Sequence, residues 1–356
     1  MPELTVTVPG RANLIGEHID YHALPVLPIA LGRAIRVRFA PRPDSRIRAV
    51  SGPYGEREFE WTGQLSPVAA GDWENYLRAA AQTVTGRWGT GRGIDAVVES
   101  DLPAAAGLSS SSALIVAFTL ALLRANGVEA GFEELMEVLP DGEQFVGTRG
   151  GGMDHAAVLG SRAGYASLIH FRPVSIRHVR IPPHWAFLVA NSRVHAEKSG
   201  AVRDRYNAIR EAGAQALLEN RELGALLALS DDEVLAEVKQ PVLRHVVTEA
   251  KRVERAVWAM EENQPESFGR LLLASHASLR DRLKISVPAV DGLVDAAMAS
   301  GAVGARLTGG GFGGCAVVFC LRNQLDSVRE GIARRFYAGD FSDIIDAEPS
   351  AGAVHS

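Results

Sequence analysis

A cluster of charged and hydrogen-bonding side chains lies close to the start of the chain. Residues 9–28 read PGRANLIGEHIDYHALPVLP and include Arg11, Glu17, His18 and Asp20. Carboxylates and an imidazole in one short segment offer donors and acceptors to several hydroxyl groups, as a sugar ligand would require. Glycines and prolines are interleaved with them, which favours a rigid loop that presents polar groups to a ligand. A solvated charged loop is the alternative that these residues alone leave open.

A run of serines stands at the start of a helical segment. Residues 103–113 read PAAAGLSSSSA and precede an apolar stretch, 114–127, that closes on a glycine. Serines in this position cap a helix, which is one interpretation. A glycine followed by small hydroxylated residues also binds phosphate, because free N–H groups and the positive end of the helix dipole face the anion. Serine hydroxyls can in addition bind Mg²⁺, which prefers oxygen ligands.

A third segment, 307–315, reads LTGGGFGGC and has five glycines in nine residues. It contains the spacing G-x-G-x-x-G, but a β-type run follows it and Arg334 stands where a dinucleotide site needs an acid. No lysine follows the glycines, so the segment is not a Walker A loop either. Two interpretations remain. One is a glycine-rich hairpin turn; the other is a loop whose bare backbone lets a phosphate or another segment approach closely.

Strands and helices must position these three segments. Alternating runs predict strands at 4–8, 34–40 and 94–100, and further strands are expected at 166–171, 177–181, 185–192 and 315–321. Runs of helical period predict helices at 73–84, 107–127, 132–139, 201–219, 242–262, 265–283 and 289–300. The mixture lacks a regular βαβ alternation, which favours an α+β fold. The pair Pro182–Pro183 predicts a domain boundary, and about 15 residues at the end are expected to form a loose tail.

The composition argues against several functional classes. The chain has 356 residues, 47% hydrophobic and 22% charged, which is typical of a soluble globular protein with room for two domains. A net charge of −5 argues against a nucleic-acid partner. Without a long apolar run or a signal peptide, we expect a cytoplasmic protein with no membrane partner, an enclosed organelle being the alternative. Cys315 and Cys320 lie in an apolar run, which predicts buried free thiols.

In this order, the three segments resemble the motifs of the GHMP kinase superfamily. Residues 9–28 are similar to the galactokinase signature, 102–113 to the ATP-binding motif of the superfamily, and 307–315 to its third motif. Further matches lie at 73–76 (WENY), 150–156 (GGGMDHA) and 275–294 (SHASLRDRLKISVPAVDGLV). The resemblance therefore extends over almost the whole chain.

The resemblance implies a fold and a reaction. The fold is α+β with two lobes, 1–180 and 181–356, and the active site lies in the cleft between them. By the same analogy, the glycine-rich segment 307–315 reaches across the cleft and packs against the serine-rich segment. The implied reaction transfers the γ-phosphoryl group of ATP, with Mg²⁺, to the anomeric hydroxyl of a sugar, galactose being the expected acceptor. We expect these small-molecule partners only, and a monomer or weak dimer.

The same resemblance implies catalytic and nucleotide-binding residues. Asp154 aligns with the aspartate that accepts or orients the sugar hydroxyl proton, and Arg11 aligns with its partner arginine. Trp73 is expected near the adenine, a core tryptophan being the alternative. The expected Mg²⁺ ligands are Ser111 and Glu143, although galactokinases usually have the acid one residue earlier. The remaining residues expected to bind ATP are Gly107, Leu108, Ser109, Ser110, Ser111, Ser112, Gly309, Gly310 and Gly311.

The acceptor side is implied in the same way. Glu17, His18 and Asp20 resemble the hydroxyl contacts of galactokinases, and Gly151 aligns with a backbone contact to the sugar. Tyr206 is the candidate for a tyrosine that lines the sugar pocket. An aromatic residue on an amphipathic helix is the alternative interpretation for it.

Two departures from the galactokinase pattern keep other functions open. His22 and His155 stand where many galactokinases have asparagine and glutamine. One alternative is therefore a kinase for a heptose, arabinose, glucuronate or N-acetylgalactosamine. Another is a non-catalytic sensor of ATP and galactose. Such sensors lose residues from the serine-rich segment, so the complete GLSSSSA and the presence of Asp154 favour catalysis.

Overall fold

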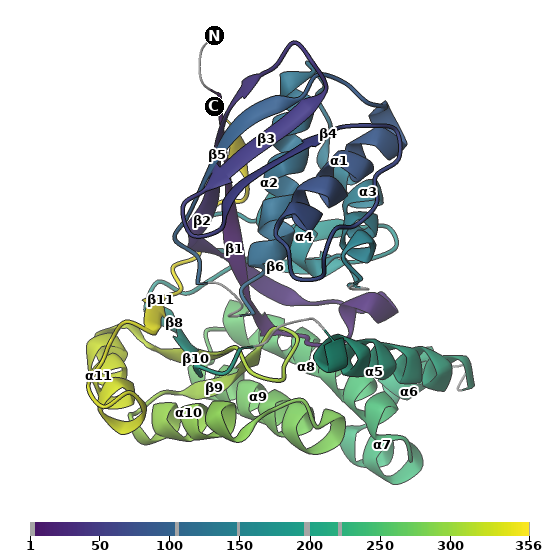
Figure 1. Cartoon of the computed structure of the whole chain (residues 1–356). Helices are drawn as coiled ribbons and strands as arrows, with labels where there is room; N and C mark the ends of the chain where they lie inside the picture. The colour runs from purple at the N-terminus through teal and green to yellow at the C-terminus, as the bar shows by residue number, and fades with distance from the viewer. Residues whose placement is uncertain (1–3, 104–106, 148–149, 196–199, 220–222, 356) are drawn as a thin grey trace.

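Two sheets organise the chain, one in each of two lobes stacked along the long axis of Figure 1. The structure is a computed structural model that describes residues 4–103, 107–147, 150–195, 200–219 and 223–355. The fold is α+β, as predicted. Among the described residues, no helix combines the length and apolarity needed to cross a membrane.

The first lobe is built on a six-stranded sheet. Its strands, in spatial order, are β12 (Val354–His355), β1 (Leu4–Ile15), β2 (Leu27–Pro41), β5 (Ile94–Ser100), β3 (Arg46–Ser51) and β4 (Gly55–Glu60). The pair β3 and β5 is parallel, and the other neighbours are antiparallel. Alternation along β2 buries Ile35, Val37 and Phe39, because successive side chains of a strand point to opposite faces.

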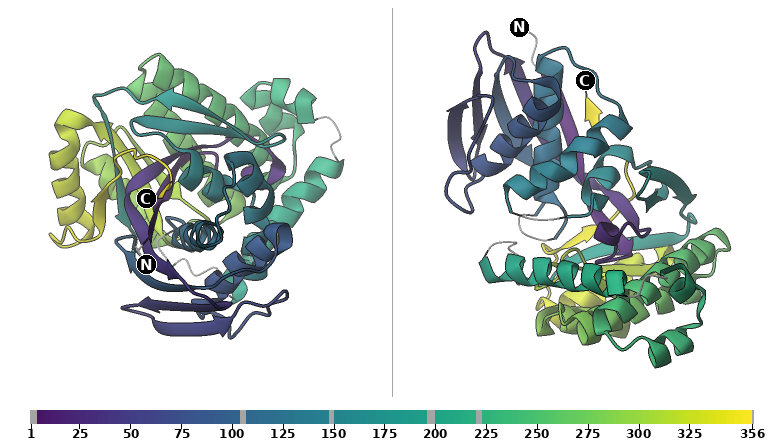
Figure 2. Two further views of the ribbon diagram at one scale, coloured as in Figure 1. Left: turned by 90° about the horizontal axis from the view of Figure 1, so that it is seen from above. Right: turned by 90° about the vertical axis from the view of Figure 1, so that its right-hand side faces the viewer.

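Helices cover one face of this sheet, as the right-hand view of Figure 2 shows. They are α1 (Glu74–Trp88), α2 (Ser110–Ala125), α3 (Phe132–Phe145) and α4 (Met153–Gly160). Phe39 of the sheet packs in one apolar cluster with Leu77 of α1 and Ile115 of α2. The other face carries exposed ion pairs such as Arg38 with Glu99, which stabilise the fold little.

The second lobe has a four-stranded antiparallel sheet and most of the remaining helices. Its strands, in spatial order, are β11 (Ile344–Asp346), β8 (Trp185–Asn191), β10 (Cys315–Leu321) and β9 (Gly304–Thr308). Its helices are α5 (Gly200–Glu219), α6 (Leu223–Ala228), α7 (Asp231–Glu237), α8 (Pro241–Glu261), α9 (Pro265–Ser278), α10 (Pro288–Ala299) and α11 (Leu325–Phe336). The long amphipathic runs predicted from the sequence form α5, α8, α9 and α10.

The two lobes share an apolar core. Leu14 and Ile15, at the end of β1, belong to the same buried cluster as Val253 of α8, Phe268 of α9 and Phe319 of β10. A hairpin of β6 (Tyr165–His170) and β7 (Ser175–Arg180) adds to this junction by bridging to the first lobe. Strand β1 therefore carries the polar residues that follow it directly onto the second lobe.

The C-terminal segment differs from the sequence prediction. The last residues do not form a loose tail, because the chain returns to the first lobe and β12 pairs with β1 (Figure 1). The backbone N–H of Ser350 also donates to the carbonyl of Ala30, at 2.9 Å. The division of the chain at residue 180 falls between β7 and β8 and stays a prediction. Cys315 and Cys320 are buried free thiols, as predicted.

Candidate functional site

A buried ion pair joins the first lobe's sheet to its helices. Arg11, on β1, donates from Nε to Asp154 Oδ1 at 2.7 Å, and its Nη2 lies 2.6 Å from the same oxygen. Asp154 lies in the first turn of α4, where the helix dipole favours a negative charge. Burial alone would lower the pKa of Arg11, but the charges of Asp154 and Glu17 outweigh burial and raise it. The predicted pair is thus a charged pair inside the protein.

A second carboxylate lies beside this pair. The hydroxyl of Ser112, on α2, donates to the carboxylate of Glu143, on α3, and its Oγ lies 3.4 Å from Asp154 Oδ2. The backbone of Gly150 lies close to the same carboxylate, because a Cβ at this position would be 2.6 Å from Glu143 Oε2. The three side chains form a compact group of oxygen atoms between three helices.

The contacts of Glu143 indicate which of the adjacent serines could share a metal ion with it. In the described part of the chain it is Ser112, and not Ser111, that contacts Glu143. Neighbouring residues of a helix point about 100° apart, so the two serines cannot both face the carboxylate. Hydroxyl and carboxylate oxygens are ligands that Mg²⁺ prefers, so Ser112 and Glu143 fit this ion chemically. Among the described residues, no group of three or more His, Cys, Asp or Glu side chains could hold a metal ion.

The serine-rich and glycine-rich segments touch across the lobes. A Cβ added to Gly309 would lie 2.7 Å from the carbonyl oxygen of Gly107, so only glycine allows this approach. Gly107 and Ser109 both have positive φ just before α2 begins. Arg11 fixes the same turn, because its Nη1 donates to the carbonyl of Gly107 at 2.7 Å. The contact expected between the two segments is confirmed, while their role in binding ATP stays a prediction.

Glu17 and His18 connect the acceptor cluster to the glycine-rich segment. Glu17 Oε1 accepts a hydrogen bond from the backbone N–H of Gly309 at 2.6 Å. Burial raises the pKa of Glu17, against the opposing charges of Arg306 and Arg11. His18 Nε2 lies 3.2 Å from the carbonyl oxygen of Gly310. Two residues of the first lobe therefore hold two glycines of the second.

Asp20 and Gly151 form the other wall of the cluster. The carboxylate of Asp20 accepts from the backbone N–H of Met153 at 3.4 Å. A Cβ on Gly151 would lie 2.6 Å from Asp20 Cγ, so this glycine lets the two segments meet. Burial, together with the negative charge of Asp154, raises the pKa of Asp20 to about 6. Tyr206, one of the buried residues of α5, has its ring centroid 5.1 Å from that of His18.

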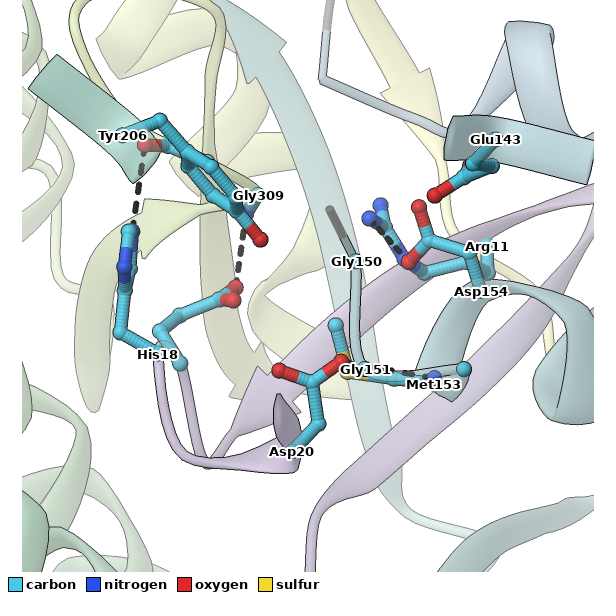
Figure 3. Close-up of a pocket in the computed structure, with 13 residues that line it drawn as sticks. Arg11, His18, Asp20, Glu143, Gly150, Gly151, Met153, Asp154, Tyr206 and Gly309 are labelled. Atoms are coloured by element: carbon cyan, nitrogen blue, oxygen red, sulfur yellow. Dashed lines mark hydrogen bonds and ion pairs between the residues drawn. The ribbon is translucent and has the colours of Figure 1, made fainter. Parts of the chain in front are cut away.

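A pocket between the lobes collects most of the predicted residues (Figure 3). It is lined by Arg11, Glu17, His18, Asp20, Glu143, Gly150, Gly151, Gly152, Met153, Asp154, Tyr206, Gly309 and Gly310. Figure 3 shows Asp20, His18 and Tyr206 on one side and the Arg11–Asp154 pair on the other. One buried cavity therefore presents an acid next to a cation, and a set of hydrogen-bonding groups facing them.

Other predicted residues lie outside this pocket. Trp73 is 7% exposed and packs in the apolar core of the first lobe. Gly311 packs against Ile285. The serine-rich residues line the neighbouring turn, and the hydroxyl of Ser109 is buried without a hydrogen bond from any described residue. Gly107 and Leu108 belong to the same turn, and Ser110, Ser111 and Ser112 form the first turn of α2.

Sequence reasoning missed some contributors. Gly150, Gly152 and Met153 line the pocket and were not named as site residues, although they lie in the matched segment 150–156 (GGGMDHA). Arg306 was not singled out, although it is fully buried and lies 3.5 Å from Glu17 Oε1. The sequence did contain a signal for Arg306, because it is a charged residue in the short run GARLT, three positions before Gly309. A charged residue in such a run is rarely buried unless it has a partner.

Comparison with family models gives three matches along the chain. Residues 1–41 match the galactokinase galactose-binding signature. Residues 75–161 match the N-terminal domain of GHMP kinases, and residues 256–338 match their C-terminal domain. Together the matches include both segments that carry the buried Arg11–Asp154 pair.

Individual relatives agree with these matches. A galactokinase of Roseiflexus sp. (strain RS-1) is 34% identical over 345 residues, covering 94% of this chain and 88% of that protein. A galactokinase of Chloroflexus aurantiacus is 36% identical over 338 residues, covering 92% and 86%. The crystal structure of Lactococcus lactis galactokinase complexed with galactose is similar in fold, with a TM-score of 0.89 at 24% identity over 99% of this chain and 95% of that one.

Proposed function

This chain belongs to the galactokinase family of the GHMP kinases, and we propose from this that it transfers the γ-phosphoryl group of ATP to the anomeric hydroxyl of galactose. The observation that carries the proposal is the Arg11–Asp154 pair, buried in a pocket that Glu17, His18 and Asp20 also line. Phosphoryl transfer depends on alignment and charge neutralisation, and this pocket offers both.

Asp154 is the proposed catalytic residue. It accepts the proton of the anomeric hydroxyl, or orients that hydroxyl for attack. Arg11 neutralises the carboxylate in the resting site and can stabilise charge that moves onto the transferred phosphoryl group. The geometry supports this role, since both contacts of Arg11 are made to Asp154 Oδ1, while Asp154 Oδ2 lies 3.4 Å from Ser112 Oγ.

The two contacting segments form the proposed ATP site. Backbone N–H groups from Gly107 to Ser111, at the N-terminus of α2, would hold the β- and γ-phosphates. Gly309, Gly310 and Gly311 would close over them from the second lobe, and the close fit of Gly309 against Gly107 supports this arrangement. Trp73 stays the candidate for the adenine side.

Glu143 and a serine hydroxyl are the proposed ligands of Mg²⁺. The hydrogen bond between Ser112 and Glu143 favours Ser112 as that serine over Ser111. Bound Mg²⁺ would neutralise charge on the phosphate oxygens. Glu143 also lines the acceptor pocket, so the same carboxylate lies where the phosphate and the sugar must meet.

The acceptor hydroxyls are proposed to bind Glu17, His18, Asp20, the backbone of Gly151, and Tyr206. Two carboxylates accept hydrogen bonds from hydroxyls, whereas the tyrosine hydroxyl and imidazole can donate or accept. Burial raises the pKa of Tyr206 well above its ordinary value, so the tyrosine stays a neutral donor. The galactose-binding signature over residues 1–41 supports galactose as the sugar.

A coupled ADP-release assay tests the proposal. Purified protein is given MgATP and each of galactose, N-acetylgalactosamine, arabinose, glucuronate and a heptose. We expect the highest kcat/KM with galactose. A higher kcat/KM with another sugar would contradict galactose as the acceptor, and galactose binding without ADP release would indicate a sensor instead of a kinase.

A further inference from the structure

Arg306 is a buried cation beneath the acceptor cluster. It belongs to β9 of the second lobe and is 0% exposed. Its Nη1 donates to the carbonyl oxygens of Asn13, at 3.1 Å, and Leu14, at 2.9 Å. Its Nη2 lies 3.5 Å from Glu17 Oε1. One guanidinium of the second lobe therefore hydrogen-bonds to the end of β1 and lies within ion-pair distance of the carboxylate that follows it.

Glu17 contacts both the proposed acceptor site and the glycine-rich segment of the proposed ATP site. It lines the proposed acceptor pocket, and its Oε1 accepts the backbone N–H of Gly309 at 2.6 Å. Gly309 in turn lies against Gly107 of the serine-rich turn. A continuous set of contacts thus runs from Arg306 through Glu17 and Gly309 to the turn proposed to hold phosphate.

The backbone around Glu17 is held separately by α8. His245 Nε2 lies 2.9 Å from the carbonyl oxygen of Glu17. Glu249 Oε1 accepts from the backbone N–H of Gly16 at 3.0 Å, and Glu249 is itself ion-paired with Arg252 at 2.8 Å. Loss of the Arg306 contact should therefore release the Glu17 side chain more than it displaces the loop that carries it.

We propose that Arg306 is a positioning residue that aligns Glu17, so that sugar and nucleotide bind this enzyme cooperatively. With Glu17 held, a sugar on one side and a phosphate on the other stabilise the same arrangement of Gly309. Each ligand then raises the affinity for the other by the same factor. The planar guanidinium is suited to this task, because it can donate to two carbonyls and face a carboxylate together. The inference rests on the proposed function.

The test measures galactose affinity by calorimetry, with and without a saturating non-hydrolysable MgATP analogue. For the natural protein we expect the analogue to tighten galactose binding about 5-fold or more. Arg306→Lys keeps the charge but loses the planar fork, so we expect the enhancement to fall below about 2-fold. Arg42→Lys is the matched control, since Arg42 pairs with Asp44 and Asp95 on the first lobe's sheet. It should keep the natural enhancement.

The possible outcomes separate the inference from the proposed function. If the natural protein binds no galactose, the proposed function itself fails. If it binds galactose with no nucleotide effect, or if Arg306→Lys keeps the full enhancement, only this inference is overturned. Should Arg306→Lys not fold, Glu17→Gln replaces it, because the amide can still accept from Gly309 but carries no charge for Arg306. A full enhancement in Glu17→Gln would equally overturn the inference.

Discussion

Asp154 lies between Arg11 and Ser112, and its charge can be removed with almost no change in shape. Asp154→Asn should lower kcat by roughly 10²- to 10⁴-fold, because the amide cannot accept the hydroxyl proton. ATP affinity should stay near that of the natural protein, since the proposed phosphate contacts come from other residues. Steady-state kinetics and nucleotide binding measure the two effects.

Asp141→Asn is the control for this variant. Asp141 is exposed on α3 and bonds to Gln144, so its loss should leave kcat unchanged. Natural turnover in Asp154→Asn would remove Asp154 from the mechanism. A large loss of ATP affinity together with turnover would indicate that Asp154 acts on the nucleotide instead.

Ser111 and Ser112 differ in what they contact, which separates their roles. Ser112→Ala removes the hydroxyl that donates to Glu143, so the Mg²⁺ concentration for half-maximal activity should rise. Ser111→Ala, one residue earlier on the same helix, is the matched control and should raise that concentration less. Titrating activity with Mg²⁺ at fixed ATP compares them. A larger effect for Ser111→Ala would restore the assignment expected from the sequence.

Asp20 costs stability at neutral pH. Its pKa rises from 3.8 to about 6 in the folded protein, which corresponds to roughly 3 kcal/mol. An acid whose folded pKa is raised destabilises the fold as it ionises. The penalty therefore begins above pH 3.8, is complete above about pH 6, and disappears as the pH falls.

Asp20→Asn should therefore raise the free energy of unfolding at pH 7.5. The gain should be clearly smaller at about pH 4.5, where the natural carboxyl is mostly protonated in the folded state. Denaturant unfolding at the two pH values measures the difference. An equal gain at both would show that ionisation of Asp20 is not its source. Sugar affinity should fall in the same variant, because an amide accepts fewer hydrogen bonds than a carboxylate.

At the scale of elements, the fit between the two loops depends on Gly309. Gly309→Ala places a Cβ only 2.7 Å from the carbonyl oxygen of Gly107, so the two loops must separate. We expect KM for ATP to rise roughly 10-fold or more, because small misplacements weaken aligned contacts strongly. Gly339→Ala is the matched control. The φ angle of Gly339 is +93°, close to the +88° of Gly309, so the backbone strain is similar, but among the described residues beyond its two chain neighbours no atom lies within 4 Å of the added Cβ. An unchanged KM in Gly309→Ala would count against the loop as part of the ATP site.

The elements that carry the pocket were predictable where one short segment encodes them. Arg11, Glu17, His18 and Asp20 lie within ten residues, and all four line the pocket. Arg306 was not predictable in this way, because its importance comes from carbonyls and a carboxylate almost 300 residues earlier in the chain. The choice between adjacent serines likewise depends on how α2 is rotated about its axis, which sequence spacing alone does not fix.

At the scale of the whole molecule, the sequence indicated the α+β class and a division into lobes, but it gave no sign of how the lobes are joined. Within β1 the sequence predicted a strand only at 4–8, yet β1 continues to Ile15, and Leu14 and Ile15 lie in a core shared with Val253 and Phe319. About 15 residues at the end of the chain were expected to be loose because chain ends are often poorly ordered. The C-terminal segment is held by backbone hydrogen bonds to the first lobe. Such distant backbone partners cannot be predicted from the composition of the segment.

This returning segment should stabilise the entire chain. The N–H groups of Ser350, Gly352 and Ala353 donate to carbonyls of the first lobe, and Gly164 donates back to Pro349. At roughly 1 kcal/mol for each hydrogen bond, deleting residues 348–356 should cost about 4 kcal/mol of unfolding free energy. The deletion also uncovers the edge of β1, which favours aggregation.

A shorter deletion, 354–356, removes β12 but keeps those four hydrogen bonds, so it should cost much less. Denaturant unfolding of the two truncated proteins beside the full chain measures the difference. Equal stability of the two would mean that β12 alone holds the segment. Natural stability in the longer deletion would mean that the segment merely rests on the first lobe, whose sheet and helices then suffice to hold β1 in place.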